Sequence, residues 1–490
     1  MGIFDFFKKK KEDEVVTEVQ NQQQTSSEMK SIEEQVKEMT MAMAAPEALK
    51  EPEAEETAGP VLLGILEAEV PADCDFLVVI ASLRGTVSKG DIFSYSHPGT
   101  SSEVLGEAKV LAVGIESGYV EKASNAKVVL HIENGRELGI RPGYVLHSKD
   151  ATPSDIQNGY IAALGESFVS AKDLILSEED EASLTLTDCA EIFRLYTWFH
   201  GKDMQTGADE TKAVLMEKLQ KFSLLMADKL VAEEVLYCPY SKKTGKPYLF
   251  SRVAKQGEQD LVCSPPNVLV FTSAYHKTMA PHFDDDRFEV KEIVNDENKK
   301  EIAKFFRECI CVNGAAGVCI LSEQTGIPAN MLVTQEMLKA CADYETLSNP
   351  ELMRYIQLLE QIGKPQTSDE ETIYKLYYAY LSRVLLRAKL LVPVRASKPL
   401  PKVVKEGRMP IPKDTKIAFY TLQGKEGRVA ACMYTDYASA KEANVSGCDY
   451  MLKSVGTMIG EFDCVLNMSK EGKSACYVNE AMFEDMKKYE

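Results

Sequence analysis

The C-terminal half of the chain contains one kind of segment twice, first as Gly201-Lys202-Asp203-Met204-Gln205-Thr206 and again as Gly363-Lys364-Pro365-Gln366-Thr367. An amphipathic helical pattern precedes each segment, which is expected to be a turn, and a second long helical pattern follows it. Short apolar runs of strand length come next in both stretches. Because one order of elements is repeated, we predict two tandem α+β modules, at residues 188–342 and 343–490.

The strand segments of the two modules also correspond. The proposed pairs are Tyr237-Cys238-Pro239 with Leu391-Val392-Pro393, Val270-Phe271-Thr272-Ser273 with Met433-Tyr434-Thr435-Asp436, and Cys309-Ile310-Cys311-Val312-Asn313 with Asp463-Cys464-Val465-Leu466-Asn467. Asn313-Gly314 is typical of a two-residue hairpin turn, because both residue types tolerate positive φ. The hydroxyl groups of Thr272 and Thr435 are expected to cap the helices that follow. The alternative to these turn and cap roles is a ligand site.

The composition is that of a globular protein with several domains. The chain has 490 residues, of which 45% are apolar and 27% charged, and this length exceeds one core of ordinary size. The net charge of −19 argues against direct nucleic-acid binding, since phosphate affinity comes from clustered Lys and Arg. The 12 cysteines show no CxxC spacing, which favours a reducing cytoplasm, and no metal or cofactor is expected.

Residues 1–59 differ in composition from the rest of the chain. They are rich in Gln, Glu, Ala and Pro, and bury too little apolar surface to offset their ordering entropy, so a disordered acidic arm is predicted. The arm begins with Phe4, Phe6 and Phe7, followed by Lys8–Lys11. Aromatic side chains beside a basic run are typical of segments at a membrane surface, so membrane contact is the alternative to a solvated end.

Residues 60–150 carry a strand pattern. Apolar runs such as residues 76–80 and 127–132 are separated by turns, among them those at Gly90 and Gly143. Many short strands at even spacing favour a small closed barrel, because closure removes exposed sheet edges. Three segments define the order of this region: Arg84-Gly85-Thr86-Val87-Ser88-Lys89-Gly90-Asp91-Ile92-Phe93, Val110-Leu111-Ala112-Val113, and Leu138-Gly139-Ile140-Arg141-Pro142-Gly143-Tyr144-Val145-Leu146.

These three segments resemble the β-barrel second domain of translational GTPases such as elongation factor Tu. The resemblance implies a barrel that supports contacts to RNA or to a neighbouring protein. Asn125 stands where the family usually has glycine. The sequence contains no GxxxxGK[ST] loop to hold the phosphates of a nucleotide. The barrel is therefore expected to serve recognition, docking or architecture, and not GTP hydrolysis.

The C-terminal motifs resemble the SseB family, bacterial proteins named for enhanced serine sensitivity. A helical lead-in, a strand ending at Pro239, an apolar strand closing on Phe271-Thr272-Ser273 and a later strand ending at Asn313 occur in the family's order, and the second module repeats that order. The resemblance implies two SseB-like α+β modules and little established chemistry.

Residues 151–187 are expected to connect the barrel to the first module, with some helical character. Asp188 is expected to open the module's first helix, with Glu191 three residues later completing a capping box.

Catalytic residues are not expected. His276, His282 and Asp285 are residue types that bind divalent metals, but a proline interrupts any shared helical face, so a solvated loop is favoured. Cys309 and Cys311 alternate in a predicted strand, which places both thiols on one, inward face. Nucleophilic use of either thiol would require a neighbouring base and an electropositive setting.

The leading hypothesis is a non-catalytic cytosolic bacterial adaptor whose barrel and tandem modules bind protein partners. The second is a translation-associated factor that docks through its barrel, and the third is an unrecognised hydrolase that uses His276, His282 and Asp285. The candidate interaction or structural residues are Arg84, Gly85, Phe271, Thr272, Asn313, Tyr434, Thr435 and Asn467.

Overall fold

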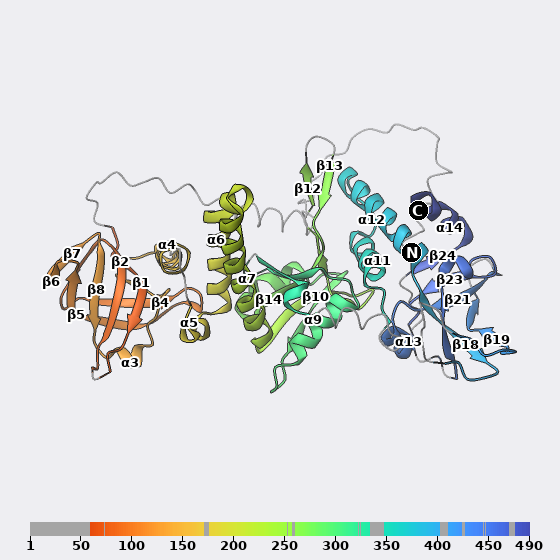
Figure 1. The fold of residues 1–490 in the computed structure, drawn as a ribbon, viewed down its shortest axis with the longest axis horizontal. Helices are drawn as coiled ribbons and strands as arrows, with labels where there is room; N and C mark the ends of the chain where they lie inside the picture. Colours follow the sequence, from red (N-terminus) through yellow and green to blue (C-terminus); the bar gives the residue numbers. More distant parts are fainter. Residues whose placement is uncertain are drawn as a thin grey trace, which may run out of the picture. The chain divides into compact units, whose positions relative to one another are not determined.

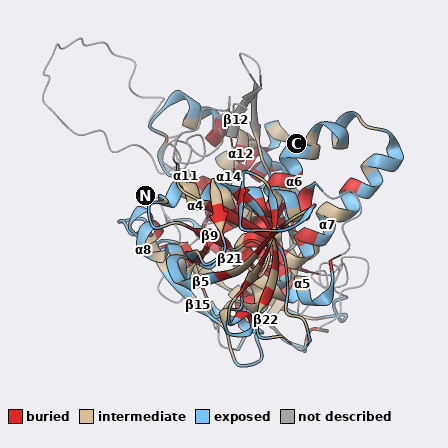
Figure 2. Ribbon diagram, turned by 90° about the vertical axis from the view of Figure 1, so that its left-hand side faces the viewer, coloured by how far each residue is buried: buried red, intermediate tan, exposed pale blue. Residues whose placement is uncertain are grey.

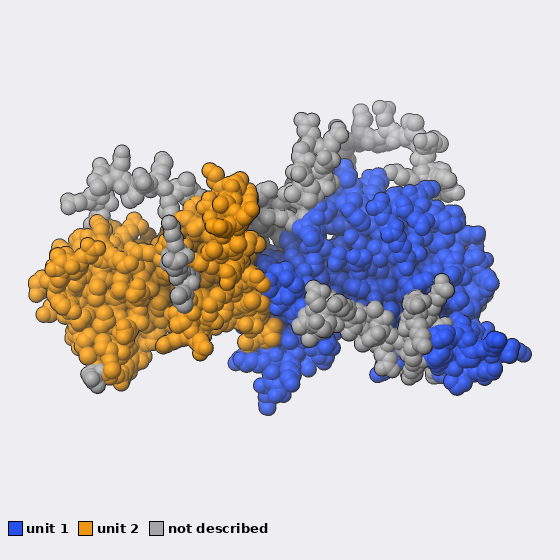
Figure 3. Space-filling view, viewed as in Figure 1, with its two compact units in different colours: residues 1–42, 233–490 blue, residues 43–232 orange. Residues whose placement is uncertain are grey.

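A computed structural model of the chain describes residues 59–72, 74–170, 176–251, 253–256, 260–321, 323, 325–333, 347–401, 410–423, 427–443, 445, 447–469 and 476–490. The chain divides into two compact units, residues 43–232 and residues 1–42 with 233–490, which we call the barrel unit and the lobe unit (Figure 3). Apart from Gly59, the predicted arm lies outside the described residues, and so does its run of phenylalanines and lysines.

Six strands of the barrel unit close into a barrel (Figure 1). Their order is β4-β9-β1-β2-β8-β5, and pairing of β4 with β5 completes the circuit. Alternate side chains of each strand point inward, so that the β2 residues Leu77, Val79, Ala81 and Leu83 are all buried. The predicted small closed barrel is confirmed. Its strands are β1 (Leu62–Glu69), β2 (Leu77–Arg84), β4 (Ile92–His97), β5 (Ser101–Ile115), β8 (Lys127–Ile132) and β9 (Val145–His147), with β6 (Gly118–Val120) beside β5, and β3 (Thr86–Ser88) paired with β7 (Lys122–Ser124).

A short helix, α3 (Gly135–Leu138), lies between β8 and β9. The helices that follow the barrel are α4 (Pro153–Leu164), η2 (Gly165–Val169), α5 (Glu178–Ser183), α6 (Leu186–Thr206) and α7 (Asp209–Ala232). Helix α4 packs closely on β1, since a Cβ atom at Gly64 would lie 3.0 Å from the carbonyl oxygen of Gly159. Helices α6 and α7 pack against each other as a helical hairpin.

Two predictions about α6 are wrong. The expected Gly-Lys turn at Gly201 lies inside the helix, which ends only at Thr206, because no proline interrupts residues 197–206 and a single glycine costs a helix only about 1 kcal/mol. The helix also begins before Asp188. Thr185 is the cap, and Asp188 completes the capping box as the third helical residue.

The lobe unit contains two α+β lobes (Figure 1). Lobe 1 has a six-stranded sheet, whereas lobe 2 has a three-stranded sheet, β19-β18-β22, and a four-stranded sheet, β20-β21-β23-β24. In lobe 1 the strand order is β15-β10-β14-β16-β17, with β14 and β16 parallel and the other pairs antiparallel. Lobe 1 contains β10 (Val235–Ser241), β11 (Leu249–Phe250), β12 (Val253–Gln256), β13 (Asp260–Cys263), β14 (Asn267–Thr272), η3 (Ser273–Tyr275), α8 (His276–Met279), η4 (Ala280–His282), β15 (Phe288–Val294), α9 (Glu301–Cys311), β16 (Gly317–Ile320), β17 (Thr325–Pro328) and η5 (Ala329–Met331).

Lobe 2 repeats this order as β22-β18-β21-β23-β24. Strands β21 and β23 are parallel, as β14 and β16 are, while the link from β18 to β21 is the single bridge between Leu391 and Tyr434. Lobe 2 contains β18 (Leu390–Ala396), β19 (Ile417–Phe419), β20 (Thr421–Gln423), β21 (Val429–Met433), α13 (Tyr437–Ala443), β22 (Asp449–Lys453), η7 (Val455–Thr457), β23 (Asp463–Leu466), β24 (Cys476–Val478), α14 (Glu480–Met486) and η8 (Lys487–Tyr489).

Strand register shows which predicted correspondences hold between the lobes. Tyr237 pairs with Phe271 in lobe 1, and Leu391 pairs with Tyr434 in lobe 2, so these segments are equivalent. The correspondence proposed for residues 309–313 is wrong, because they form the end of α9 and the turn after it. The counterpart of β23 is β16, which pairs in parallel with β14 as β23 pairs with β21.

A second pair of helices joins the two lobes. They are α11 (Pro350–Ile362) and α12 (Ser368–Arg387), separated by the turn at Gly363, whose φ is 65°. Gln361 of α11 exchanges two hydrogen bonds with the backbone of Leu249 in lobe 1, at 2.8 and 2.9 Å. Arg383 of α12 donates to the carbonyl of Tyr489 in lobe 2 at 2.7 Å. Helix α11 also contacts lobe 2, since Nδ2 of Asn467 donates to Sδ of Met353 at 3.2 Å.

Candidate functional site

The far half of the α6–α7 hairpin presents apolar side chains to solvent. Trp198, the single tryptophan of the chain, is 62% exposed, and Phe199 beside it is 57% exposed. Their rings meet edge to face with centroids 4.6 Å apart. Val214 and Met216 of α7 are also exposed. We call residues 197–216 the hairpin tip. Exposed aromatic side chains on a helix are typical of surfaces that bind another protein.

The buried residues of the hairpin lie almost entirely outside the tip. On α6 they are Leu186, Asp188, Cys189, Ala190, Ile192, Leu195 and Tyr196, and on α7 they are Leu215, Phe222, Ser223, Met226, Ala227 and Leu230. Figure 2 shows much of the hairpin as exposed surface, in contrast to the buried strands. The near half therefore packs into the barrel unit, and the tip, with Leu215 as its one buried residue, remains accessible.

Charged residues surround the aromatic pair. Asp203 lies one turn beyond Phe199 on α6, and Asp209 and Glu210 begin α7; all three are exposed. Lys212 lies 4.0 Å from the carboxylate of Asp209, at the outer limit of an ion pair. Along α6 the surface therefore changes from aromatic at residues 198–199 to charged toward the turn, with the exposed Lys202 beside Asp203.

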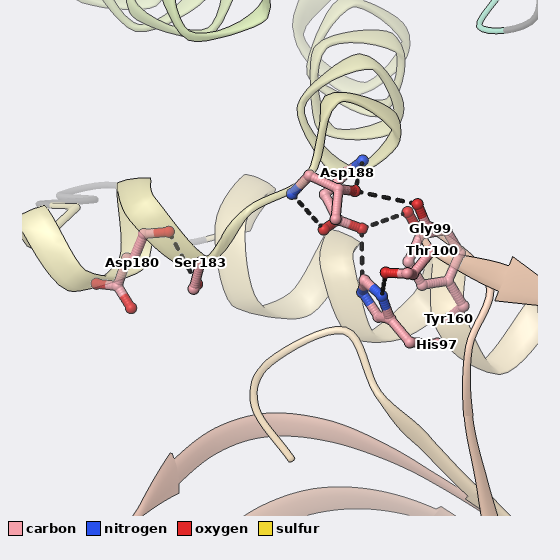
Figure 4. A network of polar contacts seen from close by, with 8 residues as sticks. His97, Gly99, Thr100, Tyr160, Asp180, Ser183 and Asp188 are labelled. Atoms are coloured by element: carbon pink, nitrogen blue, oxygen red, sulfur yellow. Dashed lines mark hydrogen bonds and ion pairs between the residues drawn. The ribbon is translucent and has the colours of Figure 1, made fainter. Parts of the chain in front are cut away.

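A buried polar network fixes the near end of α6 to the barrel (Figure 4). Nε2 of His97, the last residue of β4, lies 3.3 Å from Oδ1 of Asp188, and the two side chains are 0% and 2% exposed. This is a close polar contact and not a well-aligned hydrogen bond. The hydroxyl of Tyr160 on α4 donates to the same Oδ1 at 2.7 Å. Asp188 thus holds together a strand and two helices distant in sequence.

The surroundings of Asp188 are shaped to receive a carboxylate. A Cβ atom at Gly99 would lie 2.3 Å from Oδ1 of Asp188, so only glycine lets the backbone approach this closely. The N–H of Thr185 donates to Oδ2 at 2.8 Å. Nδ1 of His97 lies 2.5 Å from the Thr100 hydroxyl, and its ring stacks on Tyr144 at 4.5 Å.

The pKa of Asp188 is lowered from its ordinary value of 3.8. Burial acts to raise this pKa, but the adjacent His97 ring favours the ionised carboxylate. The N–H of Thr185 and the Tyr160 hydroxyl add to the lowering. Because Asp188 is ionised and buried, removing the groups that face it would leave an uncompensated charge.

Among the motif residues predicted from the sequence, the structure brings Thr435 and Asn467 together in lobe 2. The N–H of Thr435 donates to Oδ1 of Asn467 at 2.9 Å, and Nδ2 of Asn467 donates back to the Thr435 hydroxyl at 2.7 Å. Asn467 has a φ of 49°, and Tyr434 beside Thr435 is buried. The pair closes the ends of β21 and β23 and is a structural bridge.

The predicted caps are wrong. Asp436, and not Thr435, caps α13, since its carboxylate accepts from the N–H and hydroxyl of Ser439, each at 2.7 Å. No side-chain hydrogen bond from Thr272 caps η3. The Asp436 side chain, and not that of Thr435, therefore lies at the position of the N-cap, where Asp is a preferred residue.

The remaining motif residues lie apart. Arg84 is exposed at the end of β2, and the N–H of Gly85, with φ 91°, donates to Oδ1 of Asn125 at 2.7 Å. Asn125 has a φ of 45°, so it adopts the backbone conformation that a glycine would supply. Phe271 is buried in the core of lobe 1.

Asn313 does not form a hairpin turn. It follows the last turn of α9, and Gly314, with φ 79°, leads the chain into β16. The apolar positions Ile302, Phe305, Phe306, Cys309 and Ile310 recur at helical spacing, which explains why a helix forms where a strand was predicted.

The residues of the hydrolase hypothesis hold structural contacts. His276 stacks on Tyr237 with ring centroids 3.9 Å apart. The Asp285 carboxylate accepts the N–H groups of Arg287 and Phe288, both at 2.7 Å. Within the described part of the chain, no group of three or more His, Cys, Asp or Glu side chains is placed to hold a metal ion.

The thiols of Cys309 and Cys311 lie on α9, and the strand predicted for them is wrong. Both are buried. Burial raises the pKa of the Cys309 thiol well above its ordinary value, which disfavours the reactive thiolate.

The barrel carries a second surface feature, a shallow recess of about 440 Å³ beside β5, β6 and β8. Tyr119 on its wall is 69% exposed, and its hydroxyl lies 2.9 Å from Nε2 of His131. The His131 ring stacks on Phe76 at 4.6 Å. Lys89 and Glu121 place opposite charges at the same recess.

Helices long and apolar enough to cross a bilayer do not occur among the residues that the structure describes.

No family model matches the chain, and no curated protein sequence matches it. Among solved structures, the chain is similar to translation elongation factor SelB from Methanococcus maripaludis in its apo form, with 18% identity, a TM-score of 0.17 and 24% of each chain covered. It is also similar to GDP-bound aIF5B from Aeropyrum pernix, with 11% identity, a TM-score of 0.18, and 55% of this chain and 59% of that chain covered. The chain thus spans less than two thirds of either structure. TM-scores this low carry no argument about function.

Proposed function

We propose that the protein is a non-catalytic cytosolic adaptor that binds a protein partner through the hairpin tip. The observation that carries the proposal is the exposure of Trp198 and Phe199 on a helix whose other end is fixed by the Asp188 network. Tryptophan is enriched among the residues that dominate binding energy at protein interfaces, and a rigid support lowers the entropy lost on binding.

The partner that fits this tip is a protein with an apolar groove that accepts two aromatic rings at the surface of one helix. Basic residues at the rim of that groove would meet Asp203, Asp209 and Glu210 of the tip. The two lobes, whose repeated topology is compatible with tandem SseB-like modules, would bring further surfaces to the same assembly.

The test is an equilibrium binding measurement with a purified partner, first isolated by affinity capture on the full chain. Trp198→Ser with Phe199→Ser is expected to weaken binding at least about 30-fold, which corresponds to about 2 kcal/mol. Ile92→Ser is the matched control, since Ile92 is also 57% exposed and lies on the barrel. An unchanged dissociation constant for the tip variant would refute the proposal.

A translation-associated role through the barrel is the second candidate, and the recess at Tyr119 favours it. Aromatic side chains beside Lys89 form a surface suited to docking on a larger complex. The expected result is co-sedimentation with ribosomes that is lost on Tyr119→Ala. If sedimentation is absent, or survives Tyr119→Ala, docking through this recess is excluded.

A further inference from the structure

The segment that precedes α11 covers the carboxyl ends of the parallel strands β21 and β23 in lobe 2. The side-chain amide of Asn349 donates to the carbonyls of Thr435 at 2.7 Å and Lys389 at 2.9 Å. Although Asn349 stands at the N-cap position of α11, its side chain does not cap that helix. The carbonyl of Leu347 accepts the N–H of Tyr437 at 3.2 Å. The segment is therefore bound to lobe 2 by side-chain and backbone hydrogen bonds.

Strand register identifies the same end of lobe 1. Because Phe271 and Tyr434 are equivalent, Thr272 is the counterpart of Thr435. Thr435 is 0% exposed, whereas Thr272 is half-buried and Ser273, the next residue, is exposed. Among the residues that the structure describes, no segment covers this end of lobe 1 as completely as lobe 2 is covered.

Aromatic side chains lie at the uncovered end. Tyr275 of η3 is 38% exposed, and burial together with the nearby Glu323 carboxylate raises the pKa of its hydroxyl, which keeps it a hydrogen-bond donor. Tyr237, half-buried, stacks on His276 with ring centroids 3.9 Å apart. The counterpart of Tyr237 in lobe 2, Leu391, is 0% exposed. Lobe 1 therefore presents aromatic surface where lobe 2 has a covered core.

One difference in sequence changes the chemistry of this end. Leu321 is the counterpart of Asn467, since the N–H of each donates at 2.8 Å to the neighbouring parallel strand. The amide of Asn467 donates to the Thr435 hydroxyl and to Sδ of Met353 on α11, and leucine has no such donor. Leu321 is half-buried, so it offers an apolar contact in this place. We call the following residues the open end of lobe 1: Tyr237, Thr272, Ser273, Tyr275 and Leu321.

The first helical hairpin is also preceded by a segment, and its contacts lie within the barrel unit. The Thr185 hydroxyl donates to the carbonyl of Gly99 at 3.2 Å, and the Thr185 N–H donates to the Asp188 carboxylate at 2.8 Å. The segment before α11 thus covers lobe 2, while the segment before α6 attaches its helix to the barrel.

We infer that the open end of lobe 1 binds the N-terminus of a helix from a partner protein, in the way that residues 347–353 bind lobe 2. The partner presents an asparagine amide to the carbonyl of Thr272 and, one turn later, an apolar side chain to Leu321. The carbonyl can accept an additional hydrogen bond because its oxygen has two lone pairs. Ligands of open α/β sheets bind outside the carboxyl ends of the strands, which is where this surface lies. The inference concerns lobe 1 alone and does not depend on the hairpin tip.

The test uses a peptide with the sequence of residues 347–357, labelled with a fluorophore at its C-terminus. Its fluorescence anisotropy is measured on titration with the full chain, with Tyr275→Ser, which removes contact area, and with Ser273→Arg, which fills the open end. Ile411→Ser is the matched control, since Ile411 is 44% exposed and lies in lobe 2. A second peptide carries Asn349→Ala. Thermal unfolding of each protein variant verifies that the fold is retained.

The expected result is saturable binding that both open-end variants weaken at least about tenfold and that the control leaves unchanged. The Asn349→Ala peptide is expected to bind about fivefold more weakly, because a hydrogen bond is lost. Absence of saturable binding, or equal binding by the open-end variants and wild type, would overturn the inference. Equal binding of the two peptides would also overturn it, because the asparagine is the recognised group.

A further variant separates lobe 1 from lobe 2 as the binding site. Asn349→Ala in the full chain loosens the chain's own cover on lobe 2 and is expected to leave peptide binding unchanged. Binding that this variant tightens, and that Tyr275→Ser does not change, would place the peptide on lobe 2 and contradict the inference.

Discussion

Nε2 of His97 lies 3.3 Å from Oδ1 of Asp188, and neither side chain reaches solvent. His97 ends strand β4 of the barrel, and Asp188 completes the capping box of α6. This contact makes the helix that carries Trp198 part of the barrel unit. The orientation of the proposed binding surface therefore depends on a buried charge.

Replacement of Asp188 by Ala is expected to lower the free energy of unfolding of the barrel unit by about 3–5 kcal/mol, because His97 and Tyr160 lose their buried partner. Asp180→Ala is the matched control, since Asp180 makes the same capping box with Ser177 but has no such partners, and should cost about 0.5–2 kcal/mol. Urea unfolding followed by Trp198 fluorescence measures both. If the two variants lost equal unfolding free energy, Asp188 would act only as a helix cap.

The stabilisation from Asp188 is expected to depend on pH in a defined direction. The folded pKa of Asp188 is below its ordinary value of 3.8, so its contribution is fully present above that value and is lost as pH falls through the folded pKa. The gap in unfolding free energy between wild type and Asp188→Ala should therefore narrow as the pH falls below about 4. A gap that widens on acidification would contradict the assignment.

Gly201 and Gly363 are expected to respond oppositely to alanine. Gly201 lies within α6, and a Cβ atom added there would have no described atom within 4 Å, so Gly201→Ala should stabilise by about 0.5–1 kcal/mol. Gly363 has a φ of 65°, and Gly363→Ala should destabilise, because alanine is strained there. Thermal unfolding of the two variants tests the difference between the helix and the turn. If both variants were less stable than wild type, the result would favour a turn at Gly201 and contradict the helix.

Both the side chain and the backbone conformation of Asn467 are expected to contribute to the stability of lobe 2. Asn467→Gly keeps the positive φ but loses the two hydrogen bonds with Thr435, and should cost about 1–3 kcal/mol. Asn467→Ala should cost more, because it adds backbone strain. Hydrogen exchange at the Thr435 amide should accelerate in both. Unchanged exchange would show that the amide is protected by something other than Asn467.

The sequence allowed the barrel and the equivalent strands of the lobes to be predicted, because apolar alternation and turn residues are local signals. Residues 309–313 were misassigned, since a short apolar run does not distinguish a buried strand from the last turn of a helix. Gly201 was misassigned because glycine occurs both inside helices and in turns, and the sequence alone does not distinguish the two.

The candidate site could not be predicted from the sequence for a different reason. His97 and Asp188 meet only when β4 packs against α6, and no local pattern encodes that distance. Trp198-Phe199 offered a usable signal, an aromatic pair directly beyond the buried positions Leu195 and Tyr196. The sequence nevertheless does not show that the far half of the hairpin is exposed, because exposure depends on what packs beside it.

The most direct test of the central claim, that the hairpin tip binds a protein partner, is site-specific photocrosslinking. A photoreactive phenylalanine analogue is placed at position 198, and at position 92 as the control. We predict that one saturable partner crosslinks from position 198 and not from 92, and that excess unlabelled full chain competes with it while the Trp198→Ser, Phe199→Ser variant does not. Equal crosslinking from both positions, or equal competition by the variant, would contradict the claim.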